Sequence, residues 1–318
     1  MTAARHNGLW AGGTLDVAGP RESVSSVVDT AELLDEFWGL QSARVRPLGG
    51  GINSETWLVE HQEATYVAKR VSRAATADLV AGCRVAALLS EAGFVTGRPV
   101  PTSDGRLVVT EHALALLEYV PGRELAGETG ADQRCMGGTL AGIHLAGGPA
   151  PGPGVATFMT EWLAPELPGM QAHPWLVGAV KAVRAETDPL KVTWSMLHTD
   201  PSPEAFVHND STGVTGLIDW TGARRGPILY DVASAVMYLG GPEHATEFLT
   251  SYATEGPLGE AEMQHLDAFR RFREAIQGAY FAGRLAANDL TGGIDQAENE
   301  KGLDDARRRL GLLGLDSA

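Results

Sequence analysis

Two short apolar runs that each end in an aspartate constrain this chain more than any other feature of its sequence. The first run leads through Leu197 and His198 to Asp200, and the second ends at Asp219, nineteen residues later. The stretch between them opens with residues 201–203, Pro-Ser-Pro, which are turn-forming residue types. The pattern predicts two strand ends that each present a carboxylate, with a loop between them.

This arrangement resembles the phosphoryl-transfer site of protein kinases. There, one Asp faces the attacking hydroxyl and another holds Mg2+ against the phosphates of ATP. His198 and Asp200 match the start of the H-x-D-x-x-x-x-N catalytic loop, and Ala205 stands where that pattern has Asn. Either motif alone would be structural in roughly half of its occurrences, because an Asp after an apolar run is common.

A third block strengthens the resemblance. Residues 218–220 read I-D-W and residues 226–233 read G-P-I-L-Y-D-V-A. In this order and spacing the chain is similar to the aminoglycoside phosphotransferase and choline kinase-like family. The resemblance implies an α+β, bilobal protein-kinase-like fold with a small β-rich N-lobe and a larger, mainly helical C-lobe. It places the nucleotide-binding N-lobe at 29–120 and a C-lobe with catalytic loop, metal site and acceptor site at 121–318. Residues 1–28 are rich in Gly, Ala and Ser without a clear period and are expected to form a flexible tail.

The same family requires a glycine-rich turn between two strands, followed by a Lys on the next strand. Gly50 and Gly51 supply the turn, and their backbone N–H groups can approach phosphates because no Cβ intervenes. Asn53 and Ser54 add side-chain donors, and Lys69 is expected to reach the α- and β-phosphates. A plain β-hairpin with a solvated lysine is the alternative that this segment alone would favour.

A helix is expected over residues 75–92, because apolar residues recur there on one face. In the family this helix carries a Glu that pairs with the strand Lys, and Gly82 occupies that position here. Further helices are expected at 132–145, at 174–185 and across 266–313.

Two strands, at 107–110 and from Leu114 to Val120, are expected to complete the small lobe. The resemblance assigns adenine binding to the backbone around Glu118 and Val120, in the hinge before a Pro-Gly turn. An ordinary edge strand that ends at this turn is the alternative.

Composition excludes some classes of function. The chain has 25 Lys and Arg against 40 Asp and Glu, a net charge of −15, so a broad nucleic-acid-binding face is not expected. An acidic surface can attract a cationic acceptor, although many soluble proteins are acidic. No apolar stretch reaches the length of a membrane span and no signal peptide is recognisable, so we expect no membrane partner and a cytoplasmic location. Cys83 and Cys135 are expected to be buried free thiols.

The resemblance assigns a role to each residue of the catalytic block. Asp200 is expected to orient the acceptor hydroxyl and accept its proton, Asp219 to bind Mg2+, and Lys69 to hold the phosphates of ATP. Glu204 precedes the position of the missing Asn and is expected to replace it as a metal ligand, because carboxylate oxygens suit Mg2+. Loss of one ligand slows such a reaction without abolishing it, since the rate depends mainly on positioning and charge neutralisation.

The acceptor stays open at this point. A small-molecule hydroxyl, of the aminoglycoside, choline or other metabolite type, is the first interpretation. The second is a Ser or Thr of a ribosomally made precursor peptide, with a lyase partner that eliminates the phosphate in a lanthipeptide-type dehydration. The third is a degenerate, non-catalytic nucleotide-binding protein, favoured by the missing Glu and Asn. Retention of Lys69, Asp200 and Asp219 favours catalysis.

Overall fold

The protein is described from a computed structural model. It describes residues 24–49, 53–152, 155, 158, 162–164, 166, 167, 169–291 and 294–315, with side chains from Asp29 onward. The chain forms two compact units. The first runs to Glu124 and takes in Glu204–Ala223 and Thr291–Gly293; the second comprises Leu125–Pro203, Arg224–Leu290 and Ile294–Ala318. The domain boundaries expected from the sequence stay predictions.

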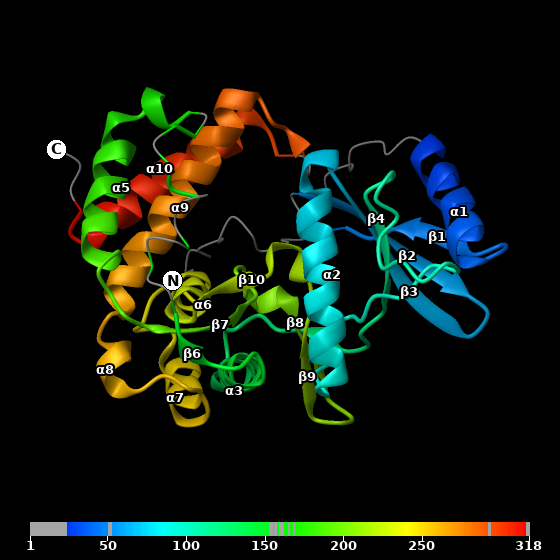
Figure 1. The fold of residues 1–318 in the computed structure, drawn as a ribbon, viewed down its shortest axis with the longest axis horizontal. Helices are drawn as coiled ribbons and strands as arrows, with labels where there is room; N and C mark the ends of the chain where they lie inside the picture. Colours follow the sequence, from blue (N-terminus) through cyan, green and yellow to red (C-terminus); the bar gives the residue numbers. More distant parts are fainter. Residues whose placement is uncertain are drawn as a thin grey trace, which may run out of the picture. The chain divides into compact units, whose positions relative to one another are not determined.

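The first unit is built on an antiparallel sheet in the order β1-β2-β3-β4 (Figure 1). Its strands are β1 (Arg44–Pro47), β2 (Ser54–His61), β3 (Ala64–Val71) and β4 (Leu114–Glu118). Side chains alternate between the two faces of a strand, so the sheet needs a cover on both sides. Helices α1 (Val24–Trp38) and α2 (Thr76–Glu91) supply residues to the two covering cores.

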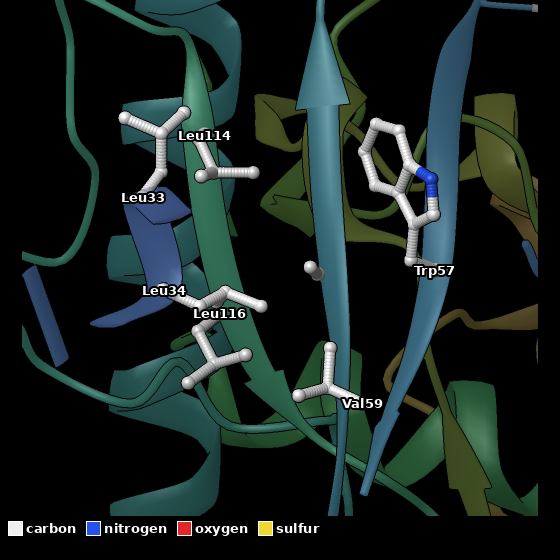
Figure 2. Close-up of a cluster of buried hydrophobic side chains, with 7 residues drawn as sticks. Leu33, Leu34, Trp57, Val59, Leu114 and Leu116 are labelled. Atoms are coloured by element: carbon white, nitrogen blue, oxygen red, sulfur yellow. The ribbon is translucent and has the colours of Figure 1, made fainter. Parts of the chain in front are cut away.

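One core lies between α1 and the sheet. Leu33 and Leu34 of α1 pack with Trp57 and Val59 of β2 and with Leu114 and Leu116 of β4, as Figure 2 shows. Ala68 of β3 belongs to this core, whereas Val71 belongs to the other, with Leu79 and Cys83 of α2. Because successive residues alternate, Lys69 shares the α2 face with Val71.

Two segments differ from the sequence prediction. Residues 107–110 contribute only an isolated bridge, Val109 to Leu114, because the chain turns back at once and Ala113 has a φ of 49°. Residues 24–28 are helical, where the sequence predicts the end of a flexible tail, since the helix that buries Leu33 and Leu34 begins at Val24. Residues 1–23 lie outside the described residues.

A second sheet completes the first unit, in the order β5-β8-β9. It consists of β5 (Arg123–Glu124), β8 (Phe206–Asn209) and β9 (Val214–Leu217). Short 3-10 turns flank these elements: η1 (Arg73–Ala75) precedes α2, η3 (Pro203–Ala205) precedes β8, and η4 (Trp220–Gly222) follows β9. Turn η4 packs against α2, which fixes the residue just before the turn, Asp219.

The second unit is mainly helical. Its helices are α3 (Gly130–Ala146), α5 (Pro174–Thr187), α6 (Leu229–Tyr238), α7 (Thr246–Glu255), α8 (Glu260–Met263), α9 (Leu266–Ala287) and α10 (Gln296–Leu312), with a 3-10 turn η2 (Met170–Ala172). Helix α9 packs against α5, α6 and α10, and α3 packs against α7 (Figure 1). A small sheet, β10-β7-β6, joins Arg224–Pro227, Thr193–Leu197 and Ala150–Pro151.

The β-rich first unit and helical second unit confirm the predicted α+β class. The predicted helices at 75–92, 132–145 and 174–185 are present, and 266–313 forms two helices, α9 and α10. None of the helices in the described part of the chain combines the length and the apolar character needed to cross a membrane.

Candidate active site

The loop that carries Asp200 is held by a buried carboxylate. Strand β7 ends at Leu197, and the backbone N–H groups of His198 and Thr199 donate to Asp231 at 2.7 and 2.8 Å. Asp231 lies in the first turn of α6 and is fully buried. Thr199 has a φ of 76°, an uncommon conformation for a residue with a Cβ. The two charge-assisted hydrogen bonds hold the backbone in this conformation just before Asp200.

Asp231 is supported in turn by His144 and Tyr252. His144 Nε2 lies 3.2 Å from Asp231 Oδ2, and His144 Nδ1 lies 2.6 Å from the Tyr252 hydroxyl. Burial, aided by the charges of Asp231 and Glu262, raises the pKa of Tyr252 well above its usual value. The Tyr252 hydroxyl therefore stays protonated and can donate a hydrogen bond to Nδ1; in that tautomer the Nε2–H group of His144 donates to Asp231. The hydrogen-bonded series Tyr252–His144–Asp231 thus supports the Asp200 loop from the core.

Asp200 itself is half-exposed, and one of its two oxygens is held. Oδ1 accepts a hydrogen bond from the hydroxyl of Tyr238, the last residue of α6. The same oxygen accepts from Nη2 of Arg273, on α9, at 3.1 Å. The side chain of Asp200 is 46% exposed and that of Arg273 only 6%. Asp200 thus offers a fixed carboxylate to solvent.

Neither Tyr238 nor Arg273 was predicted from the sequence. Arg273 follows Phe272 directly and comes four residues after Phe269, so helical geometry places it on the buried face of α9. Arg270, one residue after Phe269, is instead half-buried and pairs with the exposed Asp267 at 2.8 Å. The signal available in the sequence was therefore one arginine at an apolar position of a helix.

The first unit holds the other predicted charges. Lys69 on β3 is buried, 6% exposed, and forms an ion pair and hydrogen bond with Oδ1 of Asp219. Asp219 follows β9 with φ 67° and ψ 63°, a left-handed conformation that Asp tolerates better than most residues. The N–H of Ile218 donates to the carbonyl of Ala205 at 2.9 Å, which fixes the chain just before it. The Asp219 side chain is 53% exposed, so the carboxylate is accessible to a ligand.

Close backbone packing explains why the family's helix Glu is missing. A Cβ on Gly82 would lie 2.2 Å from the carbonyl oxygen of Trp220 and 2.9 Å from Cα of Thr221. Helix α2 and turn η4 therefore meet backbone to backbone, and no side chain fits at position 82. Lys69 takes its ion-pair partner from Asp219, at the start of the same turn.

Cys83, next to Gly82, lies on the same side of the sheet as Lys69. Burial raises the pKa of the Cys83 thiol to about 12, although the charge of Lys69 opposes the shift. Cys83 is buried and Cys135 half-buried, and both are free thiols. The high pKa leaves Cys83 as a neutral packing residue.

The structure describes only some of the remaining residues that were predicted to bind the nucleotide. Gly50 and Gly51 lie outside the described residues, between the paired strands β1 and β2. Asn53 is exposed, and Ser54 opens β2 opposite Val71. Their phosphate-binding role stays a prediction.

The hinge backbone is fixed by the sheet. The N–H of Glu118, the last residue of β4, donates to the carbonyl of Arg98 at 2.8 Å. The N–H of Tyr119 donates to the carbonyl of Thr65 at 3.3 Å, which holds the chain extended up to Val120. The role of Glu118 and Val120 in adenine binding stays a prediction.

Asp219 and Glu204 are the candidate metal ligands, and they suit a metal ion whose coordination is completed by phosphate oxygens and water. Glu204 is half-buried in η3, next to the buried Ala205. Over the described ranges, no three or more His, Cys, Asp or Glu residues cluster as a metal site would require. Mg2+ commonly uses one or two carboxylates together with waters and substrate phosphates, and the half-exposed Asp219 fits that chemistry.

The comparison with known proteins places the chain in a family. The family model described as "Phosphotransferase enzyme family" matches residues 44–274, and the chain belongs to this family. This confirms the class predicted from the sequence.

Individual relatives are more distant. A homoserine kinase of Caulobacter vibrioides (strain NA1000 / CB15N) is 30% identical over 105 residues, which are 32% of this chain and 33% of that kinase. The chain thus matches about a third of that relative's length.

Solved structures resemble the chain over most of its length. An amicoumacin kinase has a TM-score of 0.67 at 16% identity, with 91% of this chain and 93% of that chain covered. A microcompartment-associated aminopropanol kinase has a TM-score of 0.62 at 19% identity, with 92% and 100% covered. At these identities the likeness shows the fold, and it confirms the predicted protein-kinase-like architecture.

Proposed function

We propose that the protein is an ATP-dependent phosphotransferase that moves the γ-phosphoryl group onto the hydroxyl of a small molecule. The observation that carries the proposal is Asp200, a half-exposed carboxylate on a loop whose backbone is fixed by the buried Asp231. A general base must be accessible and held in one orientation, and this aspartate meets both requirements.

The nucleotide is assigned to residues of the first unit. Glu118 and Val120 would hydrogen-bond adenine through their backbone, and Gly50, Gly51, Asn53, Ser54 and Lys69 would contact the phosphates. The buried ammonium of Lys69 suits this role, because a cation held in place neutralises phosphate charge without reorganisation. The amicoumacin kinase, which shares the fold, was solved with AMP-PNP and Ca2+, and this supports ATP and a divalent cation.

Asp219 and Glu204 are the residues that would hold Mg2+. The bound cation would neutralise negative charge on the β- and γ-phosphates.

Asp200 directs the transfer itself. It accepts a hydrogen bond from the acceptor hydroxyl and aims the hydroxyl oxygen at the γ-phosphorus. The new O–P bond forms as the bond from phosphorus to the bridging β,γ-oxygen breaks, and ADP leaves with that electron pair. The hydroxyl proton passes to a carboxylate oxygen of Asp200.

A small molecule is the acceptor class that the relatives support. The similar proteins are named as kinases of homoserine, aminopropanol and amicoumacin. The net charge of −15 is compatible with a cationic acceptor such as an amino alcohol. We also propose that the protein works in the cytoplasm. A precursor peptide with a lyase partner stays a prediction that the same assay can test.

ADP release from purified protein tests the proposal. Mg2+-ATP is supplied with homoserine, 1-amino-2-propanol, choline or a synthetic Ser/Thr-rich peptide, and Asp200→Asn is the matched control. We expect one of the small molecules to stimulate ADP release in the wild type and not in the variant. If only the peptide stimulates ADP release, the acceptor is a peptide hydroxyl and not a small molecule. If the protein neither binds nor turns over ATP, the proposed function is refuted.

A further inference from the structure

Arg273 is the centre of a buried hydrogen-bond network that ends on the candidate base. Its Nε donates to Ser234 Oγ at 3.1 Å, and its Nη1 donates to Gln277 Oε1 at 2.6 Å. Its Nη2 donates to Asp200 Oδ1 at 3.1 Å and lies 3.4 Å from the Tyr238 hydroxyl. Three sides of the guanidinium group are therefore engaged by three different elements: α6, α9 and the Asp200 loop.

The contacts of Arg273 with Ser234 and Gln277 fix the orientation of its guanidinium group toward Asp200. The Ser234 hydroxyl donates to the carbonyl of Tyr230 at 2.9 Å, so its oxygen is oriented to accept from Arg273. Gln277 stands one helical turn after Arg273 on α9 and is also buried. A guanidinium is planar, so two fixed contacts leave the third donor pointing in one direction.

The charge of Arg273 is retained in this environment. Burial lowers its pKa, but the nearby Tyr230, Tyr238 and Asp200 outweigh burial, and the net shift is upward. Moving a guanidinium out of water is costly unless the partner geometry compensates. For packing alone, an apolar side chain of similar volume would serve this position at least as well.

The contacts on Asp200 are asymmetric. Within the described residues of the second unit, both hydrogen bonds to its carboxylate end on Oδ1. Tyr238 approaches from the end of α6 and Arg273 from α9, so rotation of the carboxylate would break both bonds. With Oδ1 held, Oδ2 is the oxygen left to receive a hydroxyl.

We propose that Arg273, together with Tyr238, is a positioning residue that holds Asp200 by Oδ1 and thereby aims Oδ2 at the acceptor hydroxyl. The inference rests on the proposed function, because it assigns a purpose to the orientation of the candidate base. Arg273 acts through Asp200 and does not bind the nucleotide. Its loss should lower kcat while KM for ATP stays the same. A displacement of the base by about 1 Å can cost roughly a hundredfold in rate.

The experiment compares single substitutions by steady-state ADP release, with the acceptor that gives the highest rate in the panel above, or with water as acceptor. Arg273→Gln should lower kcat about a hundredfold, and Tyr238→Phe about tenfold, at unchanged KM for ATP. Arg273→Lys, which can still donate to Oδ1, should recover part of the loss. Arg270→Gln is the matched control: the same substitution in the same helix, at a half-buried residue that pairs with the exposed Asp267 and not with Asp200. Its kcat should stay within about twofold of the wild type.

A double-variant cycle separates positioning from structural support. If Arg273 acts through Asp200, then Arg273→Gln should cause no further loss in an Asp200→Asn background. A purely structural role predicts the same fractional loss in both backgrounds, and that result would overturn the inference. If Arg273→Gln does not fold, Tyr238→Phe and Arg273→Lys give the same comparison in folded protein.

The outcomes also distinguish this inference from the proposed function. An active wild type with unaffected kcat in Arg273→Gln and Tyr238→Phe would refute the positioning role alone. A wild type that binds no ATP and releases no ADP would refute the proposed function, and the positioning role with it.

Discussion

Gly82→Ala should destabilise the first unit, and the structure allows the size of the effect to be worked out. The added Cβ would lie 2.2 Å from the Trp220 carbonyl oxygen, whereas ordinary contact begins at 3.4 Å. Both neighbouring groups are backbone, so helix and turn must separate by about 1 Å, and overpacking of this kind costs up to about 3 kcal/mol. Alanine regains about 1 kcal/mol of helix propensity. The net loss is about 2 kcal/mol.

Gly178→Ala is the matched control for this prediction. Gly178 is exposed within α5, and a Cβ there would meet nothing within 4 Å. The same substitution should therefore stabilise the protein by about 1 kcal/mol through helix propensity alone. Urea unfolding followed by circular dichroism compares each variant with the wild type. If the units unfold separately, Gly82→Ala should shift the transition of the first unit and Gly178→Ala that of the second.

The two glycine variants should thus shift in opposite directions. Equal stabilisation of Gly82→Ala and Gly178→Ala would show that α2 and η4 have room between them, and the explanation for the missing helix Glu would be wrong. Separation of helix and turn also displaces Asp219, so Gly82→Ala should raise KM for Mg2+-ATP.

Three further predictions concern the charged residues. Asp219→Ala should remove the Mg2+-dependent part of ATP binding in titration calorimetry; equal affinity of variant and wild type, with and without metal, would contradict its assignment. Asp200→Asn should retain ATP affinity and lose about a hundredfold or more in kcat, as expected for removal of a general base; a kcat within a few-fold of wild type would move that role elsewhere. Glu204→Ala should raise the Mg2+ concentration for half-maximal activity, while Ala205→Asn should be neutral or mildly activating. An unchanged Mg2+ dependence in Glu204→Ala would leave Glu204 without a metal role.

The fold was predictable because its motifs depend on local order along the chain. Each motif is recognisable within a few consecutive residues. The motifs are a strand that ends in Asp, a glycine-rich turn between strands and the block around Asp231. The Lys69–Asp219 contact joins residues 150 apart. The sequence predicted both residues, but not that they would pair with each other.

The positions that the sequence did not explain depend on contacts between distant segments. Gly82 looked like a lost catalytic residue, and only the carbonyl of Trp220 against it shows a steric cause. Arg273 and Arg270 stand three residues apart in one helix, and only the contacts of the folded chain show that Arg273 reaches Asp200 whereas Arg270 pairs with Asp267. Single-sequence periodicity gives the face of a helix, but it does not give the partner on the other side of that face.

The buried Asp231 also governs how the second unit can open. Through one carboxylate it joins β7, α3 and α6, and through His144 it reaches Tyr252 on α7. A local fluctuation that frees the Asp200 loop would remove the His198 and Thr199 donors from this carboxylate and leave it only the contact with His144. Leaving a buried acceptor unsatisfied costs about 1–3 kcal/mol. The amide protons of His198 and Thr199 should therefore exchange with solvent more slowly than those of the exposed loops. Hydrogen exchange thus tests whether the backbone before Asp200 is held more tightly than an ordinary surface loop, although the Asp200 side chain is half-exposed.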